Sequence, residues 1–180
     1  GRALVAKEIQ ADRIAPELFA SSLELSRPRR VSGSAIYLTA DPKGVPKALL
    51  HNLKHNKVLH DLTIVLSVQT VDEPRVDEDK RATVSGPTGG IWYVCLDFGF
   101  SESPDVPRAL ETVSIPGFDH DLMKTTYFVG REVVVLGKKG GMAKWRKGLF
   151  NFLFNNALSP THFFRLPPDR VVELGSQTEL

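Results

Sequence analysis

Two histidines one helical turn apart have the spacing that most directly suggests chemistry in this sequence. His51 and His55 form a His-x-x-x-His pair, and His60 follows closely. Such a pair can bind zinc, but a site also needs a third ligand and usually a carboxylate, and only Asp61 lies close in sequence. A polar helix face with hydrogen-bonded histidines explains the pattern better. We therefore expect no metal site here.

Two glycine-rich stretches could in principle hold phosphate groups. GPTGG (86–90) and GKKGG (137–141) match neither G-x-x-x-x-G-K-[ST] nor G-x-G-x-x-G. GPTGG precedes a strand, whereas phosphate loops usually follow a strand and open a helix. GKKGG does lie between a strand and a helix, where Lys138 and Lys139 could contact an anion. A surface loop is the favoured interpretation for both.

The loop after the first predicted strand is the first place to expect a ligand. Open α/β sheets bind ligands at the carboxyl ends of their strands, beside a helix N-terminus. Thr39, Asp41 and the backbone of Lys43 and Gly44 are therefore the candidate ligand-binding residues, with a nucleotide as the candidate ligand. A tight turn that binds nothing is the alternative explanation.

No combination of nucleophile, base and acid indicates an enzyme. Cys95 lies inside the apolar run IWYVCLDF, where a thiol is normally buried and inert, and no G-x-S-x-G motif occurs. The carboxylates gather at 72–79, where water and mutual repulsion explain them. We expect neither a catalytic residue nor a cofactor.

Composition indicates an ordinary globular domain. Of the 180 residues, 42% are hydrophobic and 24% are charged, and 23 Lys and Arg against 21 Asp and Glu give a net charge of +2. That balance is too even to predict a nucleic-acid partner. One cysteine cannot form an internal disulfide, which favours a reducing compartment. Since no apolar stretch reaches the roughly 20 residues that cross a bilayer, the chain by itself is expected to be soluble.

The first part of the chain predicts a connector and then a parallel β-α-β unit. Helical spacing over 3–25, divided at Pro16, and the stretch SRPRRVSG make residues 1–30 a helical connector. Because a helix separates the next two strands, they are expected to be parallel. These elements are a strand at 34–39, a helix at 46–56 and a strand at 62–70 that is buried on both faces.

The second part predicts antiparallel strands added to that unit. A short strand at 82–85, the turn GPTGG and a strand at 91–100 lie too close in sequence for a parallel crossover. The whole is expected to be a single α/β domain at 31–180, a mixed sheet with flanking helices. The other expected elements are a helix at 104–113, one or two strands at 125–137 broken at Gly130, an amphipathic helix at 138–157, and an extended tail at 161–180 on the sheet edge. Trp92, Tyr93, Phe98 and Phe100 are expected in the core.

Five sequence blocks carry a resemblance to a known family. LLHNLKHNKVLHD resembles the family's LLHNLKHNKVLHE, and it leads into a buried strand in both. RVSGSAIYLT is similar to RVPGTAVFLT, GFSESPDVPRAL to GF-x-E-x-PDVP-x-x-L, TTYFVGRE to SYFLGRE, and FFRLPPDRVVELGSQTEL to YFRLPPNRVVELGxQxEI. The blocks keep the family's order from about Arg30 to Leu180. The family usually has Arg-Tyr where this chain has Asp97-Phe98. By these blocks the chain is identified as resembling the C-terminal domain of the KUP/HAK/KT potassium-uptake transporters.

The resemblance implies a part of a proton-coupled potassium importer that lies on the cytoplasmic face of the cell membrane. The family's ion-coordinating residues belong to a membrane part outside this chain, so no transport residue carries over. The implied role is regulation or assembly, with the transporter's own transmembrane domain as partner. A second copy of the chain is a further candidate partner, through an apolar face at 149–154.

Two further functions are alternatives to that role. Relatives that resemble sensors of cyclic dinucleotides make nucleotide or cyclic-dinucleotide sensing the alternative. A nucleotide cyclase or phosphoesterase is disfavoured, because no pair of metal-binding carboxylates occurs at a credible strand end.

Overall fold

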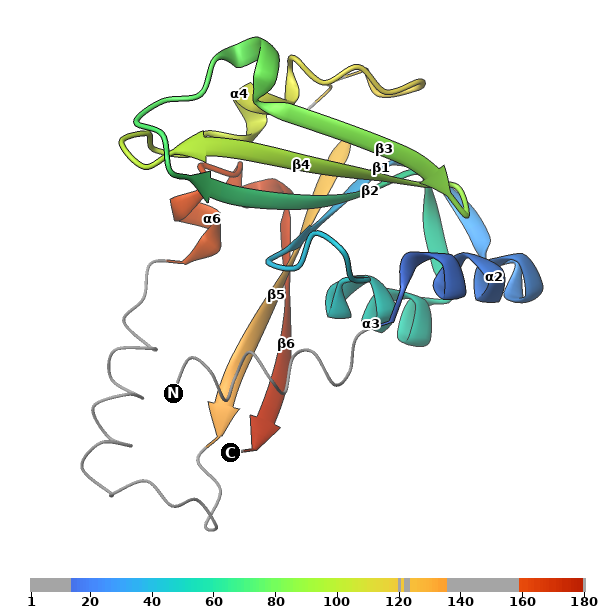
Figure 1. The fold of residues 1–180 in the computed structure, drawn as a ribbon. Coiled ribbons are helices and arrows are strands. Elements are labelled where there is room, and N and C mark those ends of the chain that lie inside the picture. Colours follow the sequence, from blue (N-terminus) through green and yellow to red (C-terminus); the bar gives the residue numbers. More distant parts are fainter. Residues whose placement is uncertain (1–13, 120, 122–123, 136–158, 180) are drawn as a thin grey trace.

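A single mixed β-sheet organises the protein. The computed structural model describes residues 14–119, 121, 124–135 and 159–179. Within them, six strands lie in the order β3-β4-β2-β1-β5-β6 (Figure 1). Neighbouring strands are parallel except for β3, which is antiparallel to β4. The predicted α/β class and mixed sheet are confirmed.

The elements follow one another along the chain with short connections. In order they are α2 (Pro16–Ser26), β1 (Arg29–Thr39), α3 (Lys47–Asn56), β2 (Val58–Val71), the 3-10 turn η1 (Glu78–Lys80), β3 (Ala82–Thr88), β4 (Ile91–Gly99), α4 (Val106–Leu110), β5 (Thr125–Val135), α6 (Pro160–Phe163), the 3-10 turn η2 (Pro168–Arg170) and β6 (Val171–Glu179).

The predicted parallel β-α-β unit is confirmed in β1, α3 and β2. Every residue of β2 from 62 to 67 is buried, as expected for a strand covered on both faces. The connector prediction for SRPRRVSG is wrong in its second half. Arg29–Val31 already pair with Val58–His60, because β2 also extends further toward the N-terminus than its apolar run indicates. The boundary at residue 30 stays a prediction.

Side chains that alternate along the strands form two cores, one on each face of the sheet. On one face Tyr37 and Phe128 stack with their ring centroids 4.5 Å apart, and Phe19 of α2 and Leu49 of α3 pack in the same cluster. On the opposite face the cluster includes Leu110 of α4. Figure 1 shows α2 and α3 on one side of the sheet and α4 on the other. Each fully buried side chain of this kind contributes about 1.5–3 kcal/mol.

Two glycine-based predictions are corrected. The turn in GPTGG is confined to Gly89 and Gly90, since β3 continues to Thr88 and pairs there with Ile91. A positive φ of +107° at Gly86 lets the strand bulge and then resume its pairing. Gly130 does not break β5, because it keeps its place in the ladder opposite Leu174.

The remaining predictions differ in outcome. Phe100 was expected in the core but is 60% exposed, because it lies just after the end of β4. The tail does lie on the sheet edge, as β6 beside β5, but two helical turns, α6 and η2, come before it. The predicted amphipathic helix at 138–157 and the apolar face at 149–154 lie outside the described residues. Within the described part of the chain, no helix combines the length and apolarity needed to cross a membrane.

Candidate functional site

The loop at the carboxyl end of β1 folds into one tight turn that contains all the predicted ligand-binding residues. The Thr39 hydroxyl accepts a hydrogen bond from the Asp41 backbone N–H at 3.1 Å. The Asp41 carboxylate accepts one from the Lys43 N–H at 3.0 Å, and the Gly44 N–H reaches the Asp41 carbonyl at 3.5 Å. The backbone amides of Lys43 and Gly44 therefore have partners within the turn, and the Lys43 side chain is the group left to contact a ligand.

A second segment lies against this turn. The Val45 N–H donates to the carbonyl of Ile14, which precedes α2, at 3.3 Å. Pro16 occupies the first turn of α2, where its missing N–H leaves no hydrogen bond unmade. The start of α2 is thereby held beside the loop between β1 and α3.

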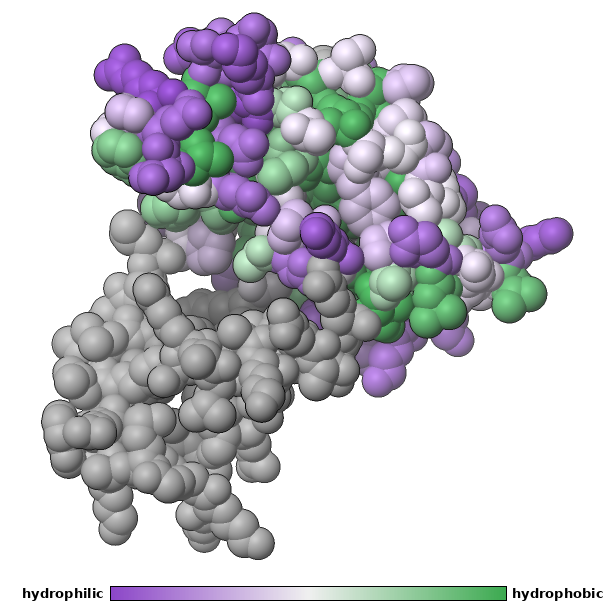
Figure 2. All heavy atoms as spheres, in the orientation of Figure 1, coloured by the Kyte–Doolittle hydropathy of each residue, from purple (hydrophilic) through white to green (hydrophobic). Residues whose placement is uncertain are grey.

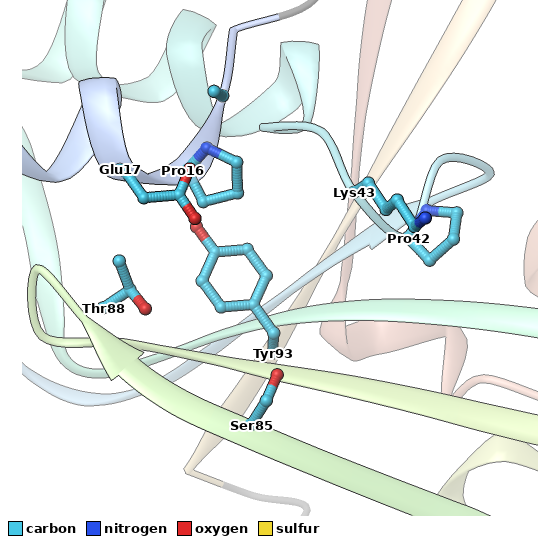
Figure 3. A pocket seen from close by; sticks show the side chains of 8 residues that line it. Pro16, Glu17, Pro42, Lys43, Ser85, Thr88 and Tyr93 are labelled. Carbon is cyan, nitrogen blue, oxygen red and sulfur yellow. The ribbon is translucent and has the colours of Figure 1, made fainter.

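Between these two segments and the sheet lies a pocket of about 530 Å³. We call it the Tyr93 pocket; its lining residues are Ala15, Pro16, Glu17, Pro42, Lys43, Ser85, Thr88 and Tyr93. Figure 3 shows the Tyr93 ring projecting from β4 toward Pro16 and Glu17, with Lys43 and Pro42 to one side and with Ser85 and Thr88 on β3. Of the predicted residues, only Lys43 lines the pocket.

The Tyr93 pocket combines apolar and polar groups and contains both signs of charge. The Tyr93 hydroxyl is buried and has no hydrogen-bond partner among the described residues. Burial, and after it the negative charge of Glu17, raise the pKa of this phenol. Glu17 and Lys43 offer opposite charges, and Ser85 and Thr88 add hydroxyls. Such a pocket can hold a polar ligand by hydrogen bonds, but Glu17 opposes a phosphate group placed next to it.

A contrasting polar cluster lies at the carboxyl end of β4, on the opposite face. The Glu102 carboxylate accepts hydrogen bonds from the N–H groups of Gly99 at 2.7 Å and Val76 at 3.1 Å, and from the Arg81 guanidinium at 2.7 Å. Arg81 also lies 4.6 Å from the centroid of the Phe98 ring. These five residues are the Glu102 cluster. Principally through Arg81, it lowers the pKa of Glu102 to about 2.

Solvent exposure separates this ion pair from the surface ones. The side chains of Arg81 and Glu102 are 10% and 17% exposed, against 73% and 74% for Lys80 and Asp77. Removing one partner of a largely desolvated, multiply hydrogen-bonded pair costs far more than removing one partner of an exposed pair, because the remaining charge stays buried without a counter-charge. The Glu102 cluster therefore holds the loop after β2 to the end of β4.

An arginine-lined cleft of about 370 Å³ adjoins the Glu102 cluster. Arg165 lies 3.4 Å from Asp105, and Arg108 lies 3.5 Å from Glu78. Asp105 also caps α4 by accepting a hydrogen bond from the Arg108 N–H at 3.2 Å. The cleft thus joins the blocks GFSESPDVPRAL and FFRLPPDR, which are far apart in sequence. No candidate site was predicted from these two blocks, although both resemble family motifs.

His51 and His55 lie near one another, whereas His60 packs against a different residue. The His51 and His55 rings are 5.7 Å apart, and His60 packs edge-on against Phe128 at 6.0 Å. Among the residues that the structure describes, no three His, Cys, Asp or Glu side chains are grouped to hold a metal ion. Burial lowers the pKa of His60, whose Nδ1 has no partner in that same part of the chain.

Cys95 is half-buried on β4. Its thiol lies 3.6 Å from a carboxylate oxygen of Asp97, and burial raises its pKa. A raised pKa disfavours the thiolate, which is the reactive form.

Comparison with known proteins relates these features to a family. Residues 32–180 match the family model described as the K+ potassium transporter C-terminal domain. The chain belongs to this family. Over all 180 residues it is 44% identical to the probable potassium transport system protein Kup of Pseudomonas aeruginosa strain LESB58 and covers 28% of that protein. Likewise, it is 43% identical to the Kup protein of the same description from Bordetella pertussis, over 182 residues and 29% of its length.

The matched stretch contains most of the sites described above. It begins at residue 32, after α2, and includes the β1–α3 loop and the Glu102 cluster. The chain spans less than a third of the length of these relatives, so most of each relative lies outside the matched part. No solved structure matches the chain. The resemblance inferred from the five sequence blocks is confirmed.

Proposed function

We propose that this potassium transporter C-terminal domain regulates or assembles a proton-coupled potassium importer from the cytosolic side of the membrane. The observation that carries the proposal is the match of residues 32–180 to the family, together with relatives named as potassium transport proteins. The chain corresponds to 28% of such a relative, so we place the permeation path in the remainder. We place no transport residue in this domain.

The fold supports a role that acts by contact. The sheet carries a hydrogen-bonded cluster around Glu102 and an open pocket at Tyr93. A domain can pass the effect of a ligand or a contact to its neighbour only if it has two states that differ in that interaction. The Tyr93 pocket and the surface of α2 and α3 are the regions we assign to such contacts.

Deletion of residues 31–180 from a full-length transporter tests the proposal. We expect potassium uptake by potassium-starved cells to fall while the membrane part is still inserted. Two point variants refine the test: Glu102→Ala should lower uptake by destabilising the domain, whereas Glu111→Ala, at an exposed position, should not. Unchanged uptake by the deletion variant, at equal amounts of protein in the membrane, would refute the regulatory role.

A nucleotide or cyclic dinucleotide is the second candidate, as a ligand of the β1–α3 loop and the Tyr93 pocket. Two features support it: the exposed Lys43 side chain, and the Tyr93 hydroxyl, which has no partner within the residues that the structure describes. The satisfied loop amides and the carboxylate of Glu17 count against it.

Thermal unfolding with ATP and with cyclic di-AMP tests that candidate. A ligand at about 100 Kd stabilises a protein by roughly 2.7 kcal/mol. Lys43→Ala should remove the shift, and Lys124→Ala, on a lysine paired with Asp119 away from the pocket, should retain it. An unchanged melting temperature at physiological concentrations of both ligands would exclude nucleotide sensing by this chain.

Two narrower expectations accompany the proposal. The relatives are named as transport proteins, and we expect no catalytic turnover; hydrolysis or cyclisation of a nucleotide that Asp41→Ala abolishes would contradict this. A homodimer through 149–154 stays a prediction, which sedimentation of the chain with and without Phe150→Ser would test.

A further inference from the structure

A groove of about 510 Å³ lies between α2 and α3, on the face of the sheet that carries Tyr37. Its apolar part consists of Phe19 and Leu23 from α2 and Leu50 and Leu53 from α3. Phe19 and Leu23 are buried and belong to the core, while Leu50 and Leu53 are only partly buried. The groove is therefore a shallow apolar depression continuous with the core.

The charged side chains that line this groove are all cationic. Arg27 and Arg29 follow α2, and Lys54 and Lys57 lie at the end of α3. None of the four makes an ion pair or a side-chain hydrogen bond with another residue in the described part of the chain. Glu24, on the adjacent turn of α2, is exposed and does not line the groove. We call this region the basic groove.

Two of these cations occupy positions where the backbone favours glycine. Arg27 (φ 42°) and Lys57 (φ 58°) cap the C-termini of α2 and α3 in the left-handed conformation. Such caps are usually glycine, because a Cβ is strained there. Cations do interact favourably with a helix C-terminus, but that effect is small at an exposed surface. Both helices thus end at a basic residue with a strained backbone conformation, beside the same groove.

The outer surface of α2 adds exposed leucines to these cations. Leu18 is 69% exposed and Leu25 is 88% exposed, and they lie two helical turns apart on one side of the helix. Figure 2 shows hydrophobic and hydrophilic side chains next to one another over α2 and α3. A helix with exposed leucines next to a cluster of basic residues is typical of a surface that lies on a lipid headgroup layer.

We propose that the basic groove and the exposed leucines of α2 dock this domain on the anionic phospholipid surface of the membrane. The lipid phosphates would meet Arg27, Arg29, Lys54 and Lys57, and Leu18 and Leu25 would enter the headgroup region. Charge complementarity selects this occupant, since four cations that have no ion-pair partner among the described residues surround an apolar floor. The inference rests on the proposed function, which places the domain beside a bilayer.

Vesicle binding by the 180-residue chain tests the proposal. The chain should sediment with vesicles of phosphatidylcholine and phosphatidylglycerol and not with phosphatidylcholine alone, and salt should weaken binding. The double variant Lys54→Gln/Lys57→Gln should bind roughly 25-fold more weakly, because each basic side chain near an anionic surface contributes about fivefold. The matched control Lys80→Gln/Lys124→Gln removes two exposed, ion-paired lysines elsewhere and should change binding little beyond its effect on net charge.

One variant separates docking from folding. Lys57→Gly removes a cation but relieves the left-handed strain, so it should weaken vesicle binding about fivefold while the chain melts at a higher temperature. A loss of binding through unfolding would instead come with a lower melting temperature.

Several results would overturn docking on lipid. These are no binding to anionic vesicles, equal losses in the groove variant and its control, binding of inorganic phosphate with no binding of vesicles, or a dimer in solution that Leu25→Ser dissociates. Vesicle binding does not report on transport. A failure here therefore leaves the deletion experiment on potassium uptake as an independent test of the proposed function.

Discussion

The Glu102 cluster and the Tyr93 pocket are both polar regions of the same sheet, but their hydrogen bonds are arranged in opposite ways. In the cluster, the Glu102 carboxylate accepts from two backbone amides and a guanidinium. In the pocket, the Tyr93 hydroxyl is buried without a partner among the described residues, and so is that of Tyr37 on the same face. Buried polar groups normally have partners, and each exception calls for an explanation.

This difference distinguishes polar groups that hold the fold together from polar groups that could bind a ligand or a partner. GFSESPDVPRAL is one of the clearest family blocks, and the carboxylate of its Glu102 accepts the hydrogen bonds that hold two loops together. Tyr93 lies in none of the family blocks, yet its hydroxyl lies beside a lysine and a glutamate and has no partner in the described part of the chain. A motif can therefore mark what holds a fold together, while unused hydrogen-bonding capacity indicates where a ligand or partner would fit.

Removal of the Glu102 carboxylate should produce the largest effect. Glu102→Ala leaves Arg81 desolvated without its counter-charge and leaves two amides without an acceptor. We expect a loss of about 3 kcal/mol in the free energy of unfolding, measured by urea denaturation. Glu111→Ala, at an exposed position, is the control and should change it by less than about 0.5 kcal/mol. Similar losses in both variants would break the comparison.

Acid should weaken the same cluster. The pKa of Glu102 is about 2 in the folded protein, against an ordinary value of 4.5. A depressed pKa stabilises the fold above the unfolded-state value, and that stabilisation is lost as the pH falls from about 4.5 toward about 2. Urea midpoints across this range should fall more steeply for the wild type than for Glu102→Ala. Parallel curves would show that this network does not lower the pKa of Glu102.

Disruption of the contact between α2 and the β3–β4 turn, beside the Tyr93 pocket, should give the next largest loss of stability. A Cβ on Gly89 would lie 2.7 Å from the Cβ of Ala20 and would also face a φ of +59°. Gly89→Ala should therefore cost about 2 kcal/mol and loosen α2. Gly117→Ala has a φ of +83° with nothing within 4 Å, so it should cost only about 1 kcal/mol. Equal denaturation midpoints for the two variants would mean that α2 does not pack on this turn.

Removal of an unpartnered hydroxyl should give the smallest effect, with the opposite sign. Tyr37 is fully buried, and its pKa is raised by that burial. Tyr37→Phe deletes a hydroxyl without a described partner, so we expect stability to rise by about 1 kcal/mol. Tyr93→Phe should act in the same direction, because its hydroxyl is also buried without a described partner. Lower stability in thermal denaturation would show that these hydroxyls do have partners in the native protein.

Part of the candidate site could be predicted from the sequence. A turn at Asp41-Pro42-Lys43-Gly44, followed by a helix, is a local signal, and the structure does place Thr39, Asp41, Lys43 and Gly44 in one turn. The pocket beside it could not be predicted. It combines the start of α2, this loop and two later strands, and no periodicity reports which loop faces which strand.

The sequence by itself determined the elements and their local order. Apolar runs and helical spacing depend on neighbouring residues, so they located the parallel β1-α3-β2 unit, β4 and α4. Only the tertiary structure decided how distant segments meet: the parallel pairing of β6 with β5, Gly130 inside an unbroken β5, Arg81 paired with Glu102, and the groove between α2 and α3. Buried polar groups need hydrogen-bond partners and apolar side chains need packing partners, and the fold supplies both from segments distant in sequence. Which segments meet is therefore a property of the whole chain.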